Sequence, residues 1–553
     1  MDMKLPFSTT GMMLHIDDSM DYEVLSSSIE SMPKSDKTED EIVLEAMAHP
    51  IGSPKLSELA KGKENVVIIC SDHTRPVPSK HIIPFMLKEI REGNPDAKIT
   101  LLIATGFHRA TTREELVGKF GEEIVDNECI AIHDSQDMDA MANIGTLPSG
   151  APLLINKIAA NADLLVSEGF IETHFFAGFS GGRKSILPGV SSKVTVLGNH
   201  CSKFIDSPYS RTGILEGNPI HKDMIAASKM AHQKYIVNVI IDADKKVVHA
   251  VAGDAIEAHA AGCKFLQDYC QVVPKKAADI AISTNGGYPL DQNMYQSVKG
   301  MTAAEAAAKD DGILIMVSNC GDGHGGEGFY EALKNCSSPA DLMAEILKVP
   351  QDQTKPDQWE YQIQCRILMQ HKVIYVMCEE HRKMAQEMGF TVANDVNEAL
   401  EMAIKEKGKD ALASAVKGMH LTQGLQKLQS SLHTVMLSMD QKIDRLGSMA
   451  EELHVAKGHL KNAFLKMNGK DTAKITERNP EQGIIFQTQK VLFQSMRSIH
   501  QLEQKTERLQ QQIGKLEARE GKQPSVKDTL QKLRQEQHPL KFGKEEKQKS
   551  AVR

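Results

Sequence analysis

The sequence has few cysteines, few aromatic residues and no long apolar run. Its nine cysteines are scattered over 553 residues without a C-x-x-C pair or a regular spacing, which predicts a reducing, cytoplasmic setting. The opening MDMKLPFSTTGMML lacks the basic and apolar regions of a secretory signal. The longest apolar stretches are of the kind VVIIC at 66–70, far short of the roughly 20 residues that cross a bilayer. The sequence therefore predicts no association with a membrane.

The composition is that of a globular protein, and its charge is unevenly distributed. Hydrophobic residues make up 41% and charged residues 25% of the chain, and the length is sufficient for two or more domains. Residues 421–553 carry 24 Lys and Arg against 15 Asp and Glu, so the overall charge of −8 combines a body of −17 with a tail of +9. We expect the two parts to have different surroundings.

Short β-branched runs alternate with helical segments in the body of the chain. Several of these runs are continuously apolar and too short for buried helices, which is typical of strands in parallel sheets covered by helices on both faces. The predicted strands are 65–70, 99–105, 163–169, 235–242, 278–284, 312–318 and 372–378. The fold class is therefore predicted as α/β, with two domains of mainly parallel sheets.

Polar loops follow three of the predicted strands. They read SDHTRPVPS, GFHRATTREEL and FIETHFFAGFSGGRKS. Because ligands bind at the carboxyl ends of strands in open α/β sheets, we expect these loops to face one crevice. Thr111 and Glu114 match a capping box, which would begin a helix there and leave His108 at the turn before it.

The segment GFSGGRKS at 178–185 resembles a nucleoside-triphosphate loop but fails at one position. The pattern G-x-x-x-x-G-K-[ST] requires glycine where this chain has Arg183, which disfavours nucleotide hydrolysis. A glycine-rich loop can still bind phosphate through its backbone N–H groups and an arginine. The residues therefore leave open both phosphate binding by Arg183 and a separate task for Lys184.

Longer motifs closely resemble those of the nickel-dependent lactate racemase family. They are SDHTRPVPS, TGFHRA, EGFIETHFFAGFSGGRKSILPGVSS, TVLGNH and GGYPLDQNMYQSVKG. The resemblance covers residues from about 8 to about 410, and the motifs are long and occur in a consistent order.

The resemblance implies a nickel-pincer nucleotide, a pyridinium mononucleotide whose thioamide and thioacid arms hold nickel. It implies covalent attachment at Lys184 and one protein ligand to nickel, His200. The other implied positions are Asp72, His73, Thr74 and Arg75 for the nucleotide, His108 and His174 for acid–base catalysis, and Gln296, Lys299, Tyr295 and Trp359 for the substrate. Enzymes that synthesise the cofactor are the implied partners.

The chemistry of racemisation agrees with these residue types. Removing a proton beside a carboxylate accumulates negative charge, whereas removing hydride avoids a carbanion and gives a ketoacid. Two histidines suit a symmetric reaction, because a free pKa near 6.5 lets each act as base or acid. Lys299 and Arg75 are candidates for binding the substrate carboxylate. Lactate is the predicted substrate, with malate or a larger 2-hydroxy acid as alternatives.

Some of these residues also fit ordinary structural roles. Asp72 fits a cap of the loop before Pro76, and Trp359, the single tryptophan, fits a core position; the sequence leaves both alternatives open. Cys201 lies beside His200, and a buried free thiol is the favoured interpretation over a second metal ligand.

The tail departs from the family. Two series of apolar residues with spacings of four and three lie within 421–516 and predict coiled-coil or hairpin helices that self-associate or pack on the body. The predicted domains are 1–272 with the cofactor and acid–base residues, 273–415 with the substrate residues, a helical extension 416–520 and a disordered basic tail 521–553. The segment 271–279 is the predicted connector.

The tail leaves two predictions open. We expect it to replace the final strand of the second domain, which would expose a sheet edge or leave part of the core unfilled. Its interleaved glutamates and lack of an aromatic platform disfavour nucleic-acid binding. The alternative function is a non-catalytic scaffold that keeps a racemase-like body and interacts through the coiled coil.

Overall fold

The first sheet of this computed structural model has six strands and holds the three polar loops. The structure describes residues 1–26, 36–242 and 244–417. The strand order is β13-β12-β9-β4-β5-β6, and all neighbours are parallel except β12 and β13. The bounds are β4 Asn65–Ser71, β5 Lys98–Ala104, β6 Cys129–Ile132, β9 Leu164–Phe170, β12 Gln233–Ile241 and β13 Val247–Gly253.

Helices cover both faces of this sheet because successive side chains of each strand point to opposite sides. In β4, Val66 and Ile68 belong to one apolar cluster with α1 and α3, whereas Val67 and Ile69 belong to another with α6, α7 and α9. The helices of this lobe are α1 Glu39–Ala48, α2 Leu56–Leu59, α3 Ile83–Gly93, α4 Arg113–Phe120, α5 Glu122–Asn127, α6 Lys157–Ala160, α7 Lys193–Asn199, α8 Ser202–Asp206, α9 Pro219–Met230 and α10 Glu257–Cys270. Each fully buried aliphatic side chain stabilises this arrangement by about 1.5–3 kcal/mol.

The second sheet also has six strands, in the order β17-β16-β15-β14-β18-β3, and all its neighbours are parallel. Ile313 and Ile315 of β15 pack with α16, and Leu314 and Met316 pack with α11 and α14. The strands are β3 Tyr22–Ser26, β14 Ala278–Thr284, β15 Ala308–Val317, β16 Lys372–Val376, β17 Thr391–Ala393 and β18 Ala413–Lys417. The helices are α11 Met294–Ala307, α12 Glu327–Lys334, α13 Pro339–Ile346, α14 Gln358–Gln370, α15 Arg382–Glu387 and α16 Val396–Lys407.

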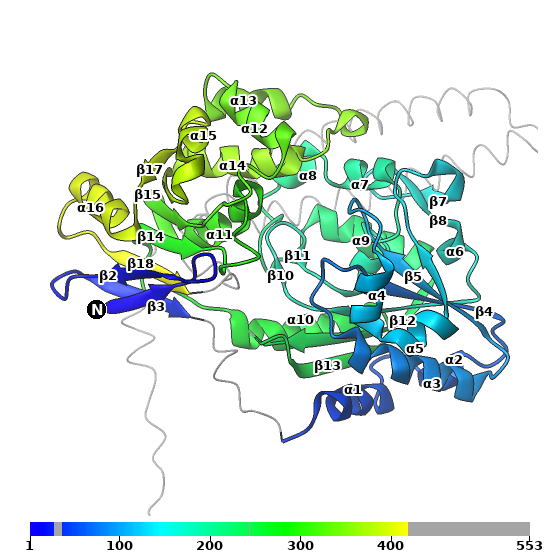
Figure 1. Cartoon of the computed structure of the whole chain (residues 1–553). Coiled ribbons are helices and arrows are strands. Elements are labelled where there is room, and N and C mark those ends of the chain that lie inside the picture. Colours follow the sequence, from blue (N-terminus) through cyan, green and yellow to red (C-terminus); the bar gives the residue numbers. More distant parts are fainter. Residues whose placement is uncertain (27–35, 243, 418–553) are drawn as a thin grey trace, which may run out of the picture. The chain divides into compact units, whose positions relative to one another are not determined.

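The first 26 residues depart from the predicted first domain, 1–272. Strand β3 pairs with β18 of the second sheet, and the blue strands of Figure 1 lie beside β14 and β18. The β1 and β2 pair, Asp2–Leu5 and Met12–His15, contributes Leu5 and Leu14 to the cluster that covers one face of this sheet. The start of the chain therefore packs with the second lobe, because its apolar side chains fill a surface there.

The expected loss of the final strand is wrong. Strand β18 lies between β14 and β3, so it occupies the interior of the sheet and β14 is not an edge. The segment ASAVK begins with three small residues and has a single β-branched one, so its sequence carries little of the apolar pattern that predicts a strand.

Each of the seven predicted strands is present, within a few residues of its predicted bounds. Short strand pairs were not predicted: β7 Met141–Thr146 with β8 Pro152–Asn156, and β10 Thr173–His174 with β11 Gly178–Phe179. The predicted helical extension lies outside the described residues from 418 onward, as does the whole basic tail. Among the described residues, no helix is both long and apolar enough to span a bilayer.

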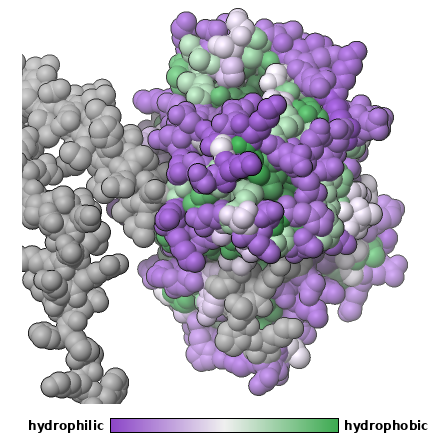
Figure 2. Space-filling model, turned by 90° about the vertical axis from the view of Figure 1, so that its left-hand side faces the viewer, coloured by the Kyte–Doolittle hydropathy of each residue, from purple (hydrophilic) through white to green (hydrophobic). Residues whose placement is uncertain are grey.

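The face drawn in Figure 2 is mainly hydrophilic, with hydrophobic residues gathered in smaller patches between hydrophilic ones. Side chains of the two lobes also contact each other. Gln351 Nε2 donates to the Gly198 carbonyl and Gln362 Nε2 donates to the Ser202 carbonyl, both at 2.8 Å. These bonds join α14 and the segment before it to α7 and α8.

The interior position of β18 leads to a stability prediction. Ala415 is fully buried, whereas Val24, its partner across the strand pair, is 36% exposed. We expect Ala415→Asp to lower the free energy of unfolding by about 3 kcal/mol or more, because it buries an unpaired carboxylate. Val24→Asp is the matched control and should cost about 1 kcal/mol or less. Urea denaturation followed by circular dichroism measures both, and equal losses would contradict the interior assignment.

Candidate active site

Three strand ends bring the polar loops together. Strands β5 and β9 both pair in parallel with β4, so the segments that follow Ser71, Ala104 and Phe170 leave the sheet at the same edge. The predicted crevice is therefore formed by neighbouring strands, and the loops carry the residues that the sequence analysis singled out.

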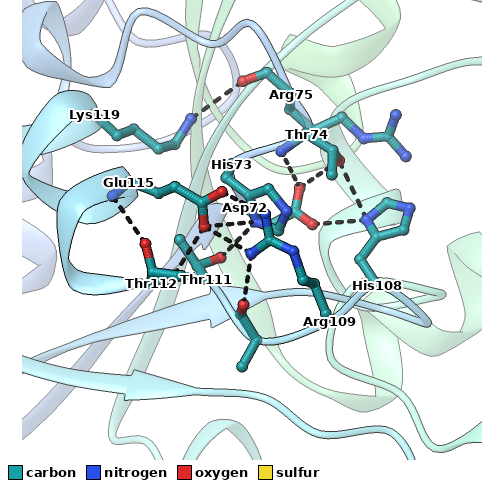
Figure 3. A network of polar contacts seen from close by, with 11 residues as sticks. Asp72, His73, Thr74, Arg75, His108, Arg109, Thr111, Thr112, Glu115 and Lys119 are labelled. Atoms are coloured by element: carbon teal, nitrogen blue, oxygen red, sulfur yellow. Dashed lines mark hydrogen bonds and ion pairs between the residues drawn. The ribbon is translucent and has the colours of Figure 1, made fainter. Parts of the chain in front are cut away.

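Asp72 binds His108 across two of these loops (Figure 3). His108 Nδ1 lies 2.6 Å from Asp72 Oδ2, and Thr74 Oγ1 donates to Asp72 Oδ1 at 2.7 Å. The Thr74 backbone N–H also reaches Asp72 Oδ1, at 3.2 Å. Asp72 thus caps its own loop, as one of the two interpretations of the sequence expected, and it also binds His108.

This contact orients the His108 ring. A carboxylate accepts only, so the proton of a neutral ring lies on Nδ1 and the lone pair on Nε2. Burial raises the pKa of the Asp72 carboxyl, but hydrogen bonds from His108 and Thr74 and the Arg75 charge outweigh it and hold the pKa below its ordinary value. Asp72 therefore stays charged, and the half-exposed His108 offers a base at Nε2.

The capping box was predicted one residue too early. Thr112, not Thr111, caps α4: its side chain accepts from the Glu115 backbone, and Glu115 accepts from the Thr112 backbone. Both frames fit the pattern, but Thr111 is buried and its hydroxyl lies 3.0 Å from His73 Nδ1. His73 is thereby held against the start of α4, and its Nδ1 is engaged there.

The loop GFSGGRKS turns tightly beneath the site. Gly181 and Gly182 have φ of +74° and +52°, and a Cβ on Gly182 would lie 2.7 Å from the His259 ring. Residues 182–185 form a single 3₁₀ turn. Arg183 is fully buried. Its guanidinium contacts backbone carbonyls and two buried histidines of the protein, so the suggestion that it binds phosphate is wrong.

Lys184 and His174 meet in poorly solvated, positively charged surroundings. Lys184 Nζ lies 3.5 Å from His174 Nε2. Desolvation, followed by the charges of Lys184, Lys299 and Arg75, lowers the pKa of His174 well below its ordinary value. Desolvation and the charges of Arg183, Arg75 and Lys299 also lower the pKa of Lys184. Both groups therefore favour their neutral forms, and the region favours an anion.

A chain of ring contacts links the loops of the first lobe to Trp359 of the second. The centroid distances are 4.5 Å for His174–Phe176, 5.1 Å for Phe176–His200, 5.2 Å for His200–Trp359 and 6.3 Å for Phe107–Trp359. Trp359 is half-buried and contacts the rings of both His200 and Phe107, so it is more than a core residue of its own lobe. His200, at the end of α7, is placed at the centre of this chain.

His200 has a buried nitrogen without a partner. Its Nδ1 makes no hydrogen bond although it is inaccessible to solvent, and burial together with the Lys184 charge lowers the pKa of His200 to about 3. Burial raises the pKa of the neighbouring Cys201 thiol, which disfavours a thiolate ligand. Among the described residues, no three His, Cys, Asp or Glu side chains are placed to hold a metal. A metal held here by the described residues would therefore have fewer than three ligands of these types.

The second lobe contributes polar side chains from α11 and α14. Lys299 Nζ donates to Gln296 Oε1 at 2.5 Å, and Tyr295, one turn earlier, hydrogen-bonds Asp357 and Trp359. Glu360 was not predicted: it is buried, one of its oxygens lacks a partner, and burial raises its pKa to about 8 although Lys299 opposes the shift. A carboxyl directly after Trp359 was the available signal, but only the fold brings it into electrostatic interaction with Lys299.

Two sequence families of assigned function match this chain. The lactate racemase N-terminal domain matches residues 7–213, and the lactate racemase C-terminal domain matches residues 273–420. A family of unknown function, DUF6674, matches residues 370–553. The first two matches include every candidate residue described above.

Curated relatives and solved structures agree. A lactate racemase from Thermoanaerobacterium thermosaccharolyticum is 52% identical over 402 residues, 73% of this chain and 94% of the relative. One from Lactiplantibacillus plantarum is 52% identical over 379 residues, 68% and 89% of the two chains. The structure of the T. thermosaccharolyticum lactate racemase apoprotein superposes with a TM-score of 0.73 at 49% identity, over 76% of this chain and all of that one. A Thermotoga maritima protein, at a TM-score of 0.51 and 18% identity over 70% of this chain and all of that one, shares the fold.

The Asp72 contact leads to a prediction about His108. We expect Asp72→Ala to release the ring, so that His108 changes from one tautomer to a mixture of both, because the acceptor that held Nδ1–H is gone. Nitrogen-15 spectra of histidine-labelled protein report the tautomer. Thr74→Val is the control: it removes the weaker 3.2 Å contact to His108 and keeps the carboxylate, so the single tautomer should persist. An unchanged spectrum in Asp72→Ala would contradict the orienting role.

Proposed function

This chain belongs to the lactate racemase family and is a racemase, an isomerase, and we propose that it interconverts D- and L-lactate with a nickel-pincer nucleotide attached at Lys184. The observation that carries the proposal is the convergence of Lys184, His174, His200 and Trp359 through a 3.5 Å contact and a continuous series of ring contacts. Residues more than 180 positions apart in the chain thereby line one site.

The residues present fit such a cofactor. Lys184 would form the covalent link, which requires a neutral amine, and its lowered pKa supplies one. Surplus positive charge from Arg75 and Lys299 favours a nucleotide that carries phosphate and acidic arms. His200 would provide the protein ligand to nickel, since its neutral ring has a nitrogen without a partner. When bound, this group supplies a hydride acceptor, so that the Cα–H bond breaks without a carbanion.

The two histidines would handle the hydroxyl proton. His108, with its proton fixed on Nδ1 by Asp72, would take the substrate proton at Nε2 and return it. His174 is kept neutral by its surroundings and would do the same for the other enantiomer. A base for each hand of the substrate matches the symmetry of a racemisation.

Lys299 and Arg75 would hold the substrate carboxylate. Lys299 is directed by its bond to Gln296, and its Nζ lies 6.0 Å from the Phe175 ring centroid. Tyr295 and Trp359, which hydrogen-bond each other, would close the apolar side against the methyl group of lactate. Trp359 and Phe107 come from different lobes. Contact between the lobes would therefore exclude water from the site and retain the ketoacid there.

The reaction itself is the first test. Protein from a host that makes the cofactor should convert D-lactate to an equal mixture of both enantiomers, contain nickel and carry added mass on the peptide with Lys184. Lys184→Ala should lose the added mass.

His108→Ala and His174→Ala should each lose roughly a hundredfold to ten-thousandfold in kcat while keeping nickel, and exposed His49→Ala should be unaffected. Loaded protein that racemises malate and not lactate would overturn the substrate assignment.

Lys299 gives a separate prediction about binding. We expect Lys299→Gln to raise KM for lactate by about tenfold to a hundredfold, because it removes a charged hydrogen bond to the carboxylate. Lys309→Gln is the control, since Lys309 is an exposed lysine of the same lobe that pairs with Asp279. Initial rates of the loaded enzyme measure both. An unchanged KM in Lys299→Gln would assign the carboxylate to Arg75 alone.

A further inference from the structure

Arg183 is a fully buried arginine whose charge is not neutralised. It is 0% exposed, and none of its hydrogen-bond partners among the described residues is a carboxylate. A buried cation ordinarily has an ionised partner, because desolvation of an unpaired charge is costly. Arg183 directly precedes Lys184 in the 3₁₀ turn that ends the GFSGGRKS loop. This position indicates the role of the buried charge.

The guanidinium is held on every side. Nη2 donates to the Ala177 carbonyl at 2.9 Å, and Nη1 donates to the carbonyls of Ser180 and Gly181, both at 3.3 Å. Nε donates to His221 Nδ1 at 3.0 Å, and Nη1 lies 3.0 Å from His259 Nε2. Arg183 therefore joins the loop before Lys184 to helices α9 and α10.

The two histidine partners are neutral. Burial, followed by the Arg183 charge, lowers the pKa of His221 to about 3 and that of His259 well below its ordinary value. His221 must lack a proton at Nδ1 to accept from Nε–H. The partners of Arg183 thus satisfy its hydrogen bonds and leave its positive charge in place.

We propose that Arg183 is a positioning residue that acts through Lys184: it fixes the loop that carries Lys184 and maintains a permanent positive charge near the lysine amine. Arg183 has no role in the proposed reaction itself and touches neither substrate nor cofactor. The inference rests on the proposed attachment at Lys184, which it deepens by naming what prepares the amine.

The backbone connects the two residues directly. The Gly181 carbonyl accepts from both Arg183 Nη1, at 3.3 Å, and the Lys184 backbone N–H, at 3.1 Å. The Gly182 N–H donates to Asn238 Oδ1 at 2.8 Å, and a Cβ on Gly182 would collide with His259. The turn therefore packs closely against His259 of α10, and Arg183 holds it in that position. In this position the Lys184 side chain is half-buried and directed to His174.

The charges around Lys184 are consistent with this role. Desolvation lowers its pKa most, and Arg183 is the largest charged contributor, ahead of Arg75 and Lys299. Glu172 opposes the shift, and His174, whose Nε2 lies 3.5 Å from Lys184 Nζ, is neutral. An anion that binds in the site would neutralise Arg75 and Lys299. Arg183 is fully buried, so we expect its charge to keep lowering the pKa of Lys184.

Competitive labelling of cofactor-free full-length protein with acetic anhydride tests the proposal. Labelling joins Nζ to the acetyl carbon and releases acetate and one proton, so it reports the neutral amine. In the unaltered chain we expect the labelling of Lys184, measured by peptide mass spectrometry, to reach half-maximum at a pH well below that of exposed lysines such as Lys264. A midpoint equal to that of the exposed lysines would overturn the proposal without any variant.

Variants separate the charge from the fold. Arg183→Met should move the Lys184 midpoint upward by about one pH unit, so that labelling below the midpoint is about tenfold slower. Arg183→Gln keeps some of the hydrogen bonds without the charge, and should also move the midpoint upward. Arg211→Met is the matched control, because Arg211 is a second desolvated arginine that bonds to the carbonyls of Ser207 and Ser210. It should lower the melting temperature and leave the midpoint unchanged.

The outcomes distinguish the two proposals. A folded Arg183→Met protein with an unchanged Lys184 midpoint would show that Arg183 is only structural. If Arg183→Met does not fold, Arg183→Gln makes the same comparison: an unchanged Lys184 midpoint would overturn the proposal, and a raised midpoint would support it. None of these measurements requires nickel, cofactor or lactate, so failure of the racemisation assay leaves the labelling result intact.

Discussion

Lys184, Lys299 and Arg75 lie close enough together to lower the pKa of His174, in surroundings that water solvates poorly. Glu172, Glu360 and Asp72 act against this positive charge, and Glu360 is itself shifted toward its neutral form. A desolvated region with surplus positive charge either releases protons or takes up anions. Both responses suit the proposed function: the lowered pKa of Lys184 favours its neutral amine, and the remaining positive charge favours a nucleotide phosphate and a substrate carboxylate.

The scaffold holds this charge in place by ordinary means. Strands β4, β5 and β9 end at one sheet edge, and each following loop is anchored by a side chain that is itself satisfied. Asp72 caps its loop and orients His108, while Arg183 ties the loop of Lys184 to two helices. Polar groups buried with full partners rigidify their surroundings, so the reactive side chains need few contacts of their own.

Particular residues show where inference from the sequence reaches its limit. The strand at 278–284 was predicted at its observed bounds, because a run of buried apolar residues is a local signal. The capping box was predicted one residue too early, because two overlapping frames fit the pattern. Thr111 contacts His73, which is distant in the sequence, and Thr112 caps the helix. Strand β18 was missed, and it is interior only because residues from the start of the chain cover its far side. Phosphate binding by Arg183 was left open, because the neighbouring residues in the sequence do not show that its side chain is buried.

The sequence by itself determined the α/β class, the order of the main strands and the motifs that carry the family resemblance, since these depend on residues near one another in the chain. The tertiary structure decided which charges share a site, which polar groups lose their water and which nitrogen of His108 is free. Glu360 interacts electrostatically with Lys299, more than 60 residues away in the chain. The Trp359 ring contacts the His200 ring, more than 150 residues away. Electrostatic shifts depend on distance in space and on desolvation, and neither quantity exists until distant segments pack together.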